Sequence, residues 1–215
     1  MDIKTDSKSI ALLAVFSAII IVLEIFPVTG LTDLKFYPGG TQFTLDWTGI
    51  PIIIVFVGLG IISSLISIGI MFFAINFHGN FPGSVFKGIA EIFTIIGVLI
   101  AKIISDKKAL GKKASASLYL IFGASTRTIG MFFVNIPLLS IFYPLSYGTT
   151  DLAIIASTVL IPWNILQAGI NILGGLVLYQ LIPENLRIQA GFEKHQPDEV
   201  KYEELSEDEL RAEDE

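Results

Sequence analysis

The stretch WTGIPIIIVFVGLGIISSLISIGIMFFAINF (residues 47–77) decides how often this chain can cross a membrane. As a single helix it would be roughly 46 Å long at about 1.5 Å per residue, well beyond a hydrocarbon core of about 30 Å. A split at Gly58-Leu59-Gly60 gives two short helices instead. The first of them, over about residues 47–59, would be only about 20 Å long.

The distribution of lysines decides between five spans and six. The segment SDKKALGKK (105–113) carries four lysines against one aspartate, so the positive-inside rule predicts a cytoplasmic position, and Lys4 and Lys8 predict the same for the N-terminus. Two cytoplasmic points must be separated by an even number of membrane crossings. Only a split of 47–77 into two helices gives four crossings between the N-terminus and residues 105–113. The apolar runs fall at about 9–27, 47–77, 83–105, 115–145 and 151–183. We therefore predict an all-α integral membrane protein, a six-transmembrane-helix bundle with both termini cytoplasmic, that is multi-pass in the cell membrane.

Composition agrees with this class and divides the chain in two. Of the 215 residues 53% are hydrophobic and only 16% are charged, which is typical of integral membrane proteins. Residues 193–215 hold eleven Asp/Glu against three Lys/Arg, a local charge of −8, so the first 192 residues are at about +2. We predict a membrane domain over 1–192 and an acidic, disordered cytoplasmic tail over 193–215. The chain has no cysteine, and no metal site is predicted.

Polar residues recur inside the fifth predicted helix, in RTIGMFFVNIP (127–137). Arg127, Met131 and Asn135 are spaced i, i+4, i+8 and are predicted to share one helix face. Pro137 is expected to disrupt the backbone ladder two residues later, freeing carbonyls for a ligand or a neighbouring helix.

The sixth predicted helix repeats this pattern in IPWNILQAGIN (161–171). Asn164, Gln167 and Asn171 follow i, i+3, i+7 on one stripe, just after Pro162. Two helices that each carry a proline and a polar stripe predict a polar pocket between them. The alternative is hydrogen bonding between helices through amide side chains, which membrane proteins use often.

Other polar and small residues suggest structural roles. Lys87 and Glu91 are spaced i, i+4 and are expected to neutralise each other, while Glu24 could reach the interface or the pocket. The long segment 28–46 is predicted to lie outside, as a lid or as an ordinary connector. Alanines on the first helix could allow close approach by another span or another chain. No nucleotide-binding loop, Ser/His pair or H-E-x-x-H motif occurs, so no catalytic residue and no enzymatic activity are predicted.

Four sequence pieces together resemble a known family. They are AVFSA (14–18), FTLDWTGIP (43–51), the R-T-I-x-M-x-x-x-N-x-x pattern of Arg127–Pro137, and the P-x-N-x-x-[K] pattern at Pro162–Gln167. On these the chain resembles the substrate-binding (S) components of energy-coupling factor (ECF) vitamin transporters, most closely the riboflavin-binding branch. The likeness covers about residues 8–183.

The resemblance implies a six-helix protein that binds a vitamin from outside, under the loop after its first helix. Its partners would be a transmembrane ECF coupling subunit and two ATPase subunits, with no nucleic acid and with riboflavin as transported ligand rather than cofactor. The coupling contact would involve Ala11, Ala14 and Ala18. Arg127, Lys87 and Glu91 are expected to be structural or coupling residues. The substrate-binding residues would be Asn135, Asn164, Gln167, Phe43, Thr44, Leu45, Asp46 and Trp47.

The chain departs from that branch at two places. Gln167 stands where the branch usually has lysine, so an amide that donates and accepts replaces a cation. The stretch after the second helix also lacks the expected G-P and lysine pattern. Thiamine or biotin is therefore an alternative ligand, and a membrane enzyme or a scaffold is a more distant alternative.

Overall fold

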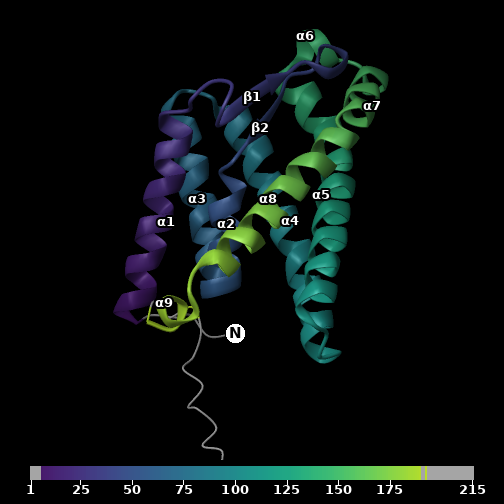
Figure 1. Cartoon of the computed structure of the whole chain (residues 1–215). Coiled ribbons are helices and arrows are strands. Elements are labelled where there is room, and N and C mark those ends of the chain that lie inside the picture. Colours follow the sequence, from purple (N-terminus) through teal and green to yellow (C-terminus); the bar gives the residue numbers. More distant parts are fainter. Residues whose placement is uncertain (1–5, 190–191, 193–215) are drawn as a thin grey trace, which may run out of the picture.

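The computed structural model describes residues 6–189 and 192, and most of them are helical (Figure 1). Its elements in chain order are α1 (Ser7–Ile25), β1 (Asp33–Phe36), a 3₁₀ turn η1 (Pro38–Gly40), β2 (Phe43–Asp46), α2 (Gly49–Leu59), α3 (Ile61–Phe77), α4 (Phe81–Lys107), α5 (Lys112–Phe142), α6 (Pro144–Tyr147), α7 (Thr150–Val159), α8 (Ile161–Leu181) and α9 (Glu184–Gln189). The acidic segment predicted to be disordered, 193–215, lies outside the described residues.

Four of these helices, α1, α4, α5 and α8, are long and apolar enough to cross a membrane. The helices α2, α3 and α7 are apolar but shorter, with 11, 17 and 10 residues. The structure is thus that of a helix-rich, multi-pass membrane protein. The six-span count and the cytoplasmic position of both termini stay predictions.

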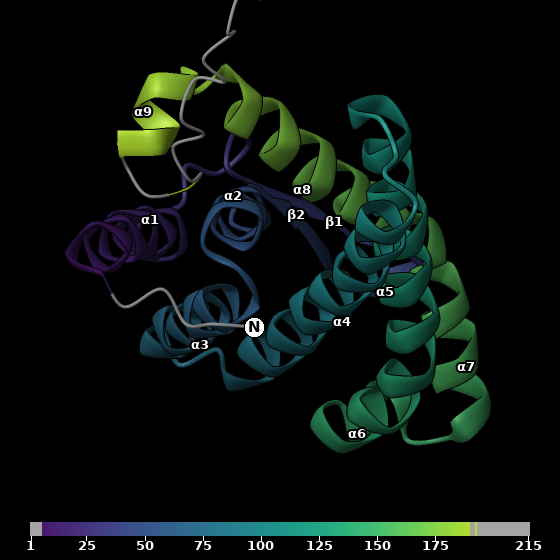
Figure 2. The same ribbon diagram turned by 90° about the horizontal axis from the view of Figure 1, so that it is seen from below.

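The predicted split of residues 47–77 is confirmed. Helix α2 ends at Leu59, α3 begins at Ile61, and Gly60 between them has φ +92°, a left-handed conformation that favours glycine. Every residue of α2 except Val57 is buried. Seen from below, α2 lies in the middle of the bundle with α1, α3, α4 and α8 around it (Figure 2). The short helix is therefore the core of the fold.

The segment after α1 was predicted to be a connector or lid in an all-α protein. It contains two short strands instead, so the all-α class is incomplete. Strands β1 and β2 form an antiparallel hairpin, with Asp33 opposite Asp46 and Phe36 opposite Phe43. Gly39 and Gly40 make the turn possible, since their φ angles are +56° and +82°. The hairpin lies across one end of the bundle (Figure 1).

The two proline-containing segments differ from the sequence prediction. Residues 151–183, expected as one span, form α7 and α8, which are separated at Leu160; Pro162 lies in the first turn of α8, where its missing N–H is tolerated. The expected disruption at Pro137 is confined to the hydrogen bond that a proline cannot donate, because α5 continues through it to Phe142. A single proline removes one donor, and the long contact of α5 with α4 holds the rest of the helix together.

Candidate functional site

The polar stripes of α5 and α8 face the interior of the bundle. Arg127, Met131 and Asn135 are all buried, which confirms that they share one face, and so are Asn164, Gln167 and Asn171. Burial of so many polar groups requires partners for them. These partners come from α4, from the hairpin and from the stripes themselves.

Arg127 joins three helices. Its Nη1 donates to Glu91 Oε1 at 2.6 Å and to Thr94 Oγ1 at 3.1 Å, both on α4, and its Nε donates to Asn164 Oδ1 on α8 at 3.4 Å. Arg127 is 4% exposed and Glu91 only 1%. The pair therefore neutralises two charges inside the bundle, in agreement with a bracing role for Arg127.

The network continues from Glu91 along α8. Asn171 Nδ2 donates to Glu91 Oε1 at 2.9 Å, and Asn171 Oδ1 accepts from Gln167 Nε2 at 2.8 Å. Gly49 at the start of α2 leaves the space for Asn171, because a Cβ there would lie 1.9 Å from Asn171 Nδ2. A methyl group at position 49 would thus displace Asn171 from both partners.

Gln167 connects this network to the hairpin. Its Oε1 accepts from the backbone N–H of Asp46 at 3.1 Å, and its Nε2 donates to the backbone carbonyl of Asp46 at 2.8 Å. An amide can both donate and accept, whereas the ammonium of a lysine can only donate. A glutamine at this position therefore holds the end of β2 against α8 by one accepted and one donated hydrogen bond, which a lysine could not do.

Lys87 forms a second link to the hairpin. Its ammonium lies 2.9 Å from Asp46 Oδ2 and also contacts Glu24 Oε1 on α1. The expected pairing of Lys87 with Glu91 is wrong. Their spacing does orient both toward the interior, but Glu91 pairs with Arg127 there. Lys87 lies one turn nearer the hairpin and pairs with two carboxylates from other elements.

Asp46 is the residue where these contacts converge. Its Oδ1 accepts from the backbone N–H of Thr48 at 3.0 Å and from Thr48 Oγ1 at 2.5 Å. Burial alone would raise the pKa of the Asp46 carboxyl, but the charge of Lys87 and the bonds from Thr48 outweigh it, so that the pKa lies below its ordinary value. Asp46 is thus held as a carboxylate.

An aromatic cluster lies between the hairpin and α8. The Trp163 ring stacks on Phe36 with centroids 4.8 Å apart, and Phe43 lies 6.3 Å from the same ring. Leu45 is buried and Thr44 is partly buried in the same strand. Trp47, in contrast, is 42% exposed and donates its Nε1–H to the carbonyl of Leu31.

Asn135 stands apart from the connected network. Its side chain is 1% exposed, yet its Nδ2 has no hydrogen-bond partner among the described residues. Glu91 Oε2 is likewise buried without such a partner. Because leaving a buried polar atom unsatisfied is costly, these two atoms are the candidates for contact with a bound molecule.

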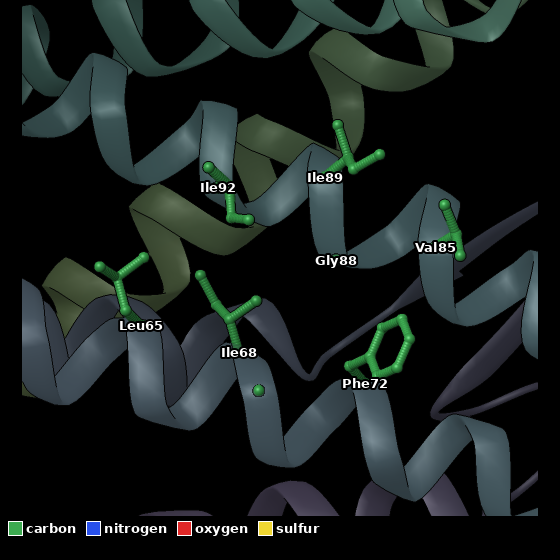
Figure 3. A pocket seen from close by; sticks show the side chains of 8 residues that line it. Leu65, Ile68, Phe72, Val85, Gly88, Ile89 and Ile92 are labelled. Atoms are coloured by element: carbon green, nitrogen blue, oxygen red, sulfur yellow. The ribbon is translucent and has the colours of Figure 1, made fainter. Parts of the chain in front are cut away.

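Two apolar hollows lie on the flanks of the bundle rather than at the polar network. One, of about 320 Å³, lies between α3 and α4 (Figure 3) and is lined by Leu65, Ile68, Gly69, Phe72, Val85, Gly88, Ile89 and Ile92. The other, of about 910 Å³, lies mainly between α5 and α8 and includes Trp47. Neither is lined by Asn135, Asn164 or Gln167, so the polar network and the hollows are separate features.

The alanines of α1 lie on the surface. Ala11, Ala14 and Ala18 are all exposed, whereas Ser17 and Ile20 on the same helix are buried. The alanine face is therefore accessible within the described part of the chain and could accept another helix.

The structure brings together Asp46, Gln167, Asn164, Arg127, Glu91 and Lys87, but not Asn135 or Trp47. Sequence reasoning missed Trp163, Thr48 and Thr94 as site residues. Trp163 had a signal, because it lies between Pro162 and Asn164 in the polar stripe segment. Among residues 6–189 and 192, no group of three or more His, Asp or Glu side chains could hold a metal ion.

Comparison with known proteins gives no relative of this chain: no family model, no curated protein and no solved structure matches it.

Proposed function

We propose that this protein is the riboflavin-binding S component of an ECF-type transporter in the cell membrane, and that it captures the vitamin for ATP-driven uptake by partner subunits. The observation that supports this most is the contact between α8 and the hairpin. Gln167 binds both backbone groups of Asp46 while Trp163, four residues earlier, stacks on Phe36. Such a hairpin over an amide stripe suits a site that opens and closes around a ligand.

The chemistry of the region suits a flavin. A flat ring system needs an apolar, partly aromatic slot, and the rings of Trp163, Phe36 and Phe43 supply aromatic surfaces for stacking. The polar ring edge and the ribityl chain need fixed donors and acceptors. In the proposed complex Asn135 Nδ2 donates to a ligand oxygen, and Glu91 Oε2 accepts from a ligand hydroxyl or N–H.

The proposal is tested by titrating the purified chain with riboflavin from nanomolar to micromolar concentration. We expect quenching of the fluorescence of the two tryptophans and of the flavin itself, with a yellow protein after desalting. A colourless protein with unchanged tryptophan and flavin fluorescence would exclude riboflavin as the ligand.

A second vitamin is the alternative, and Gln167 is the observation that favours it. Where the riboflavin branch has a cation, this chain has an amide bonded to Asp46. Thermal unfolding with riboflavin, thiamine and biotin in parallel separates the two proposals, because only the bound ligand raises the unfolding midpoint.

Replacing Asn135 by leucine is expected to weaken riboflavin binding by about 1–3 kcal/mol, since a ligand polar group then lacks its partner. Stability without ligand should hold, because Asn135 Nδ2 has no hydrogen bond to lose among the described residues. Asn171→Leu is the matched control. It removes bonds to Glu91 and Gln167 and should lower the unfolding midpoint even without ligand. Equal affinity of wild type and Asn135→Leu would remove Asn135 from the site.

Enlarging the alanine face is expected to separate uptake from binding. Ala14→Leu or Ala18→Leu should reduce riboflavin uptake in cells that also produce the coupling subunit and the ATPases, because a larger side chain prevents close helix approach. Binding by the purified protein should stay unchanged. Ala114→Leu, at an exposed alanine of α5, is the control for added size. If binding falls together with uptake, the alanines serve packing within the chain.

A further inference from the structure

The turn between α4 and α5 carries a concentrated positive charge. Lys107, Lys108, Lys112 and Lys113 are all exposed, and within residues 6–189 and 192 none of them forms an ion pair. The neighbouring Asp106 instead pairs with Lys102 at 3.4 Å. These four lysines, here called the lysine turn, lie at the end of two membrane-spanning helices and hence at the membrane surface.

The larger apolar hollow begins near this turn. It measures about 910 Å³ and lies where α5 and α8 cross at an angle (Figure 1). Its lining is almost entirely apolar: Trp47, Ile50, Leu120, Ile121, Ala124, Ser125, Thr128, Ile129, Ile165, Leu166, Gly169, Ile170, Leu173 and Gly174. A hollow of this kind on the flank of a membrane-spanning helix pair is filled by apolar material.

One face of α5 joins the lysine turn to the hollow. Leu120 follows Lys113 by seven residues and Ala124 follows it by eleven, so that all three lie on nearly the same side of the helix. Seven residues correspond to about 10 Å along the helix axis. This separation suits a molecule with an anionic group at the membrane surface and an apolar chain that begins within the bilayer.

We propose that an anionic phospholipid binds here, with its phosphate at Lys112 and Lys113 and an acyl chain in the hollow between α5 and α8. Clustered lysines beside a membrane-spanning helix attract anionic lipid, and each contributes about as much as a fivefold change in binding. Apolar contact between the acyl chain and the hollow adds the part of the binding free energy that depends on the acyl chain. The site is independent of the riboflavin proposal, since it lies outside the polar network.

The smaller hollow between α3 and α4 lies far from the lysine turn and serves as an internal control. It is apolar as well, but its α4 lining ends at Ile92, about four turns before Lys107 (Figure 3). Any lipid there has no lysine turn beside its headgroup. The two hollows therefore provide a test and its control within one chain.

Lipid retention tests the headgroup. The full chain, purified in detergent, is mixed with phosphatidylglycerol or with phosphatidylcholine of identical acyl chains, and bound lipid is counted by native mass spectrometry. We expect about 25-fold preference for phosphatidylglycerol, and its loss in Lys112→Gln/Lys113→Gln. The charge-matched control Lys8→Gln/Lys35→Gln changes two exposed lysines elsewhere and should keep the preference.

Filling the hollow tests the acyl chain. A Cβ at Gly169 would meet only Leu120 Cδ1 at 4.0 Å, so Gly169→Leu fills the hollow without a backbone clash. It should reduce phosphatidylglycerol retention about tenfold, whereas Gly69→Leu in the smaller hollow, where a Cβ meets nothing within 4 Å, should not. Ala124→Leu on the α5 wall is a second filling variant.

Three results would overturn the proposal. The first is equal retention of the two lipids by the wild type. The lysine turn would then serve to orient the chain in the membrane or to bind an acidic partner protein. The second is unchanged retention in both filling variants. The third is displacement of phosphatidylglycerol by an equal concentration of glycerol 3-phosphate, because the lysines would then bind a phosphate ester without the hollow.

Discussion

Replacement of Arg127 by methionine is expected to lower the free energy of unfolding by about 3–5 kcal/mol. The variant keeps the side-chain volume but leaves the Glu91 carboxylate, 1% exposed, without its cation. Thr94 Oγ1 and Asn164 Oδ1 lose a donor at the same time. The loss reflects an uncompensated buried charge more than the net value of the ion pair, because desolvation offsets much of the attraction in the intact pair.

A second substitution separates charge from packing. In Arg127→Met/Glu91→Gln the buried charge is gone, and the amide oxygen at position 91 can still accept from Asn171 Nδ2. We expect this double variant to recover most of the loss. Lys102→Met, which removes the exposed pair with Asp106, should change stability by less than about 1 kcal/mol.

The measurement is denaturant unfolding in detergent micelles, followed by helical circular dichroism. A loss below about 1 kcal/mol in Arg127→Met would mean that water reaches the pair, contrary to its burial in the bundle. A double variant as unstable as the single one would mean that the shape of the guanidinium, not its charge, supports the three helices.

The helices of this fold could be predicted from the sequence because long apolar runs have few alternatives. The split at Gly60 followed from a length limit and the parity of lysine-marked loops. The structure supplies the local cause, since the φ of +92° at this position favours glycine. The hairpin could not be found in this way, because its strands have only four residues each and their pairing depends on packing over α8.

The candidate site was predictable in part for a related reason. Helical periodicity determines which residues share a face, so both buried stripes were correct. It cannot determine which residue faces a stripe from another helix. Lys87 and Glu91 illustrate the limit: their spacing allows a mutual pair, but the packing of α1, α5 and the hairpin around α4 gives each a separate partner.

Replacement of Lys87 by methionine is expected to lower the free energy of unfolding by about 3–5 kcal/mol at neutral pH. Two carboxylates, from Glu24 on α1 and Asp46 on β2, would lose the cation they share. Asp46 also carries the backbone groups bound by Gln167, so its displacement affects the attachment of the hairpin. The effect should therefore be largest at the end of the bundle that the hairpin covers.

The loss should depend on pH in a defined direction. In the wild type the pKa of Asp46 lies below its ordinary value, so its contribution to stability is present at neutral pH and disappears as the pH falls through the native pKa. Without Lys87, only the bonds from Thr48 oppose burial, so the pKa of Asp46 rises and protonation becomes more favourable in the folded variant. The difference between wild type and variant therefore shrinks in two ranges: between about pH 7 and about 4 through the variant, and below about pH 4 through the wild type.

Amide hydrogen exchange decides whether Lys87 acts on the hairpin or only on global stability. Under native conditions Lys87→Met should accelerate exchange within Phe43–Asp46 more than within α5, whereas Arg127→Met should have its larger effect on α4 and α5. Addition of Asp46→Asn to Lys87→Met removes one of the two carboxylates left without a cation and leaves Oδ1 available to Thr48. It should therefore restore part of the protection of Phe43–Asp46 against exchange. A uniform rise in exchange across the bundle would contradict a local role. Lys87 would then stabilise the core as Arg127 does, and the polar attachment of the hairpin to the helices would depend on Gln167 and on the bond between Thr41 and Tyr147.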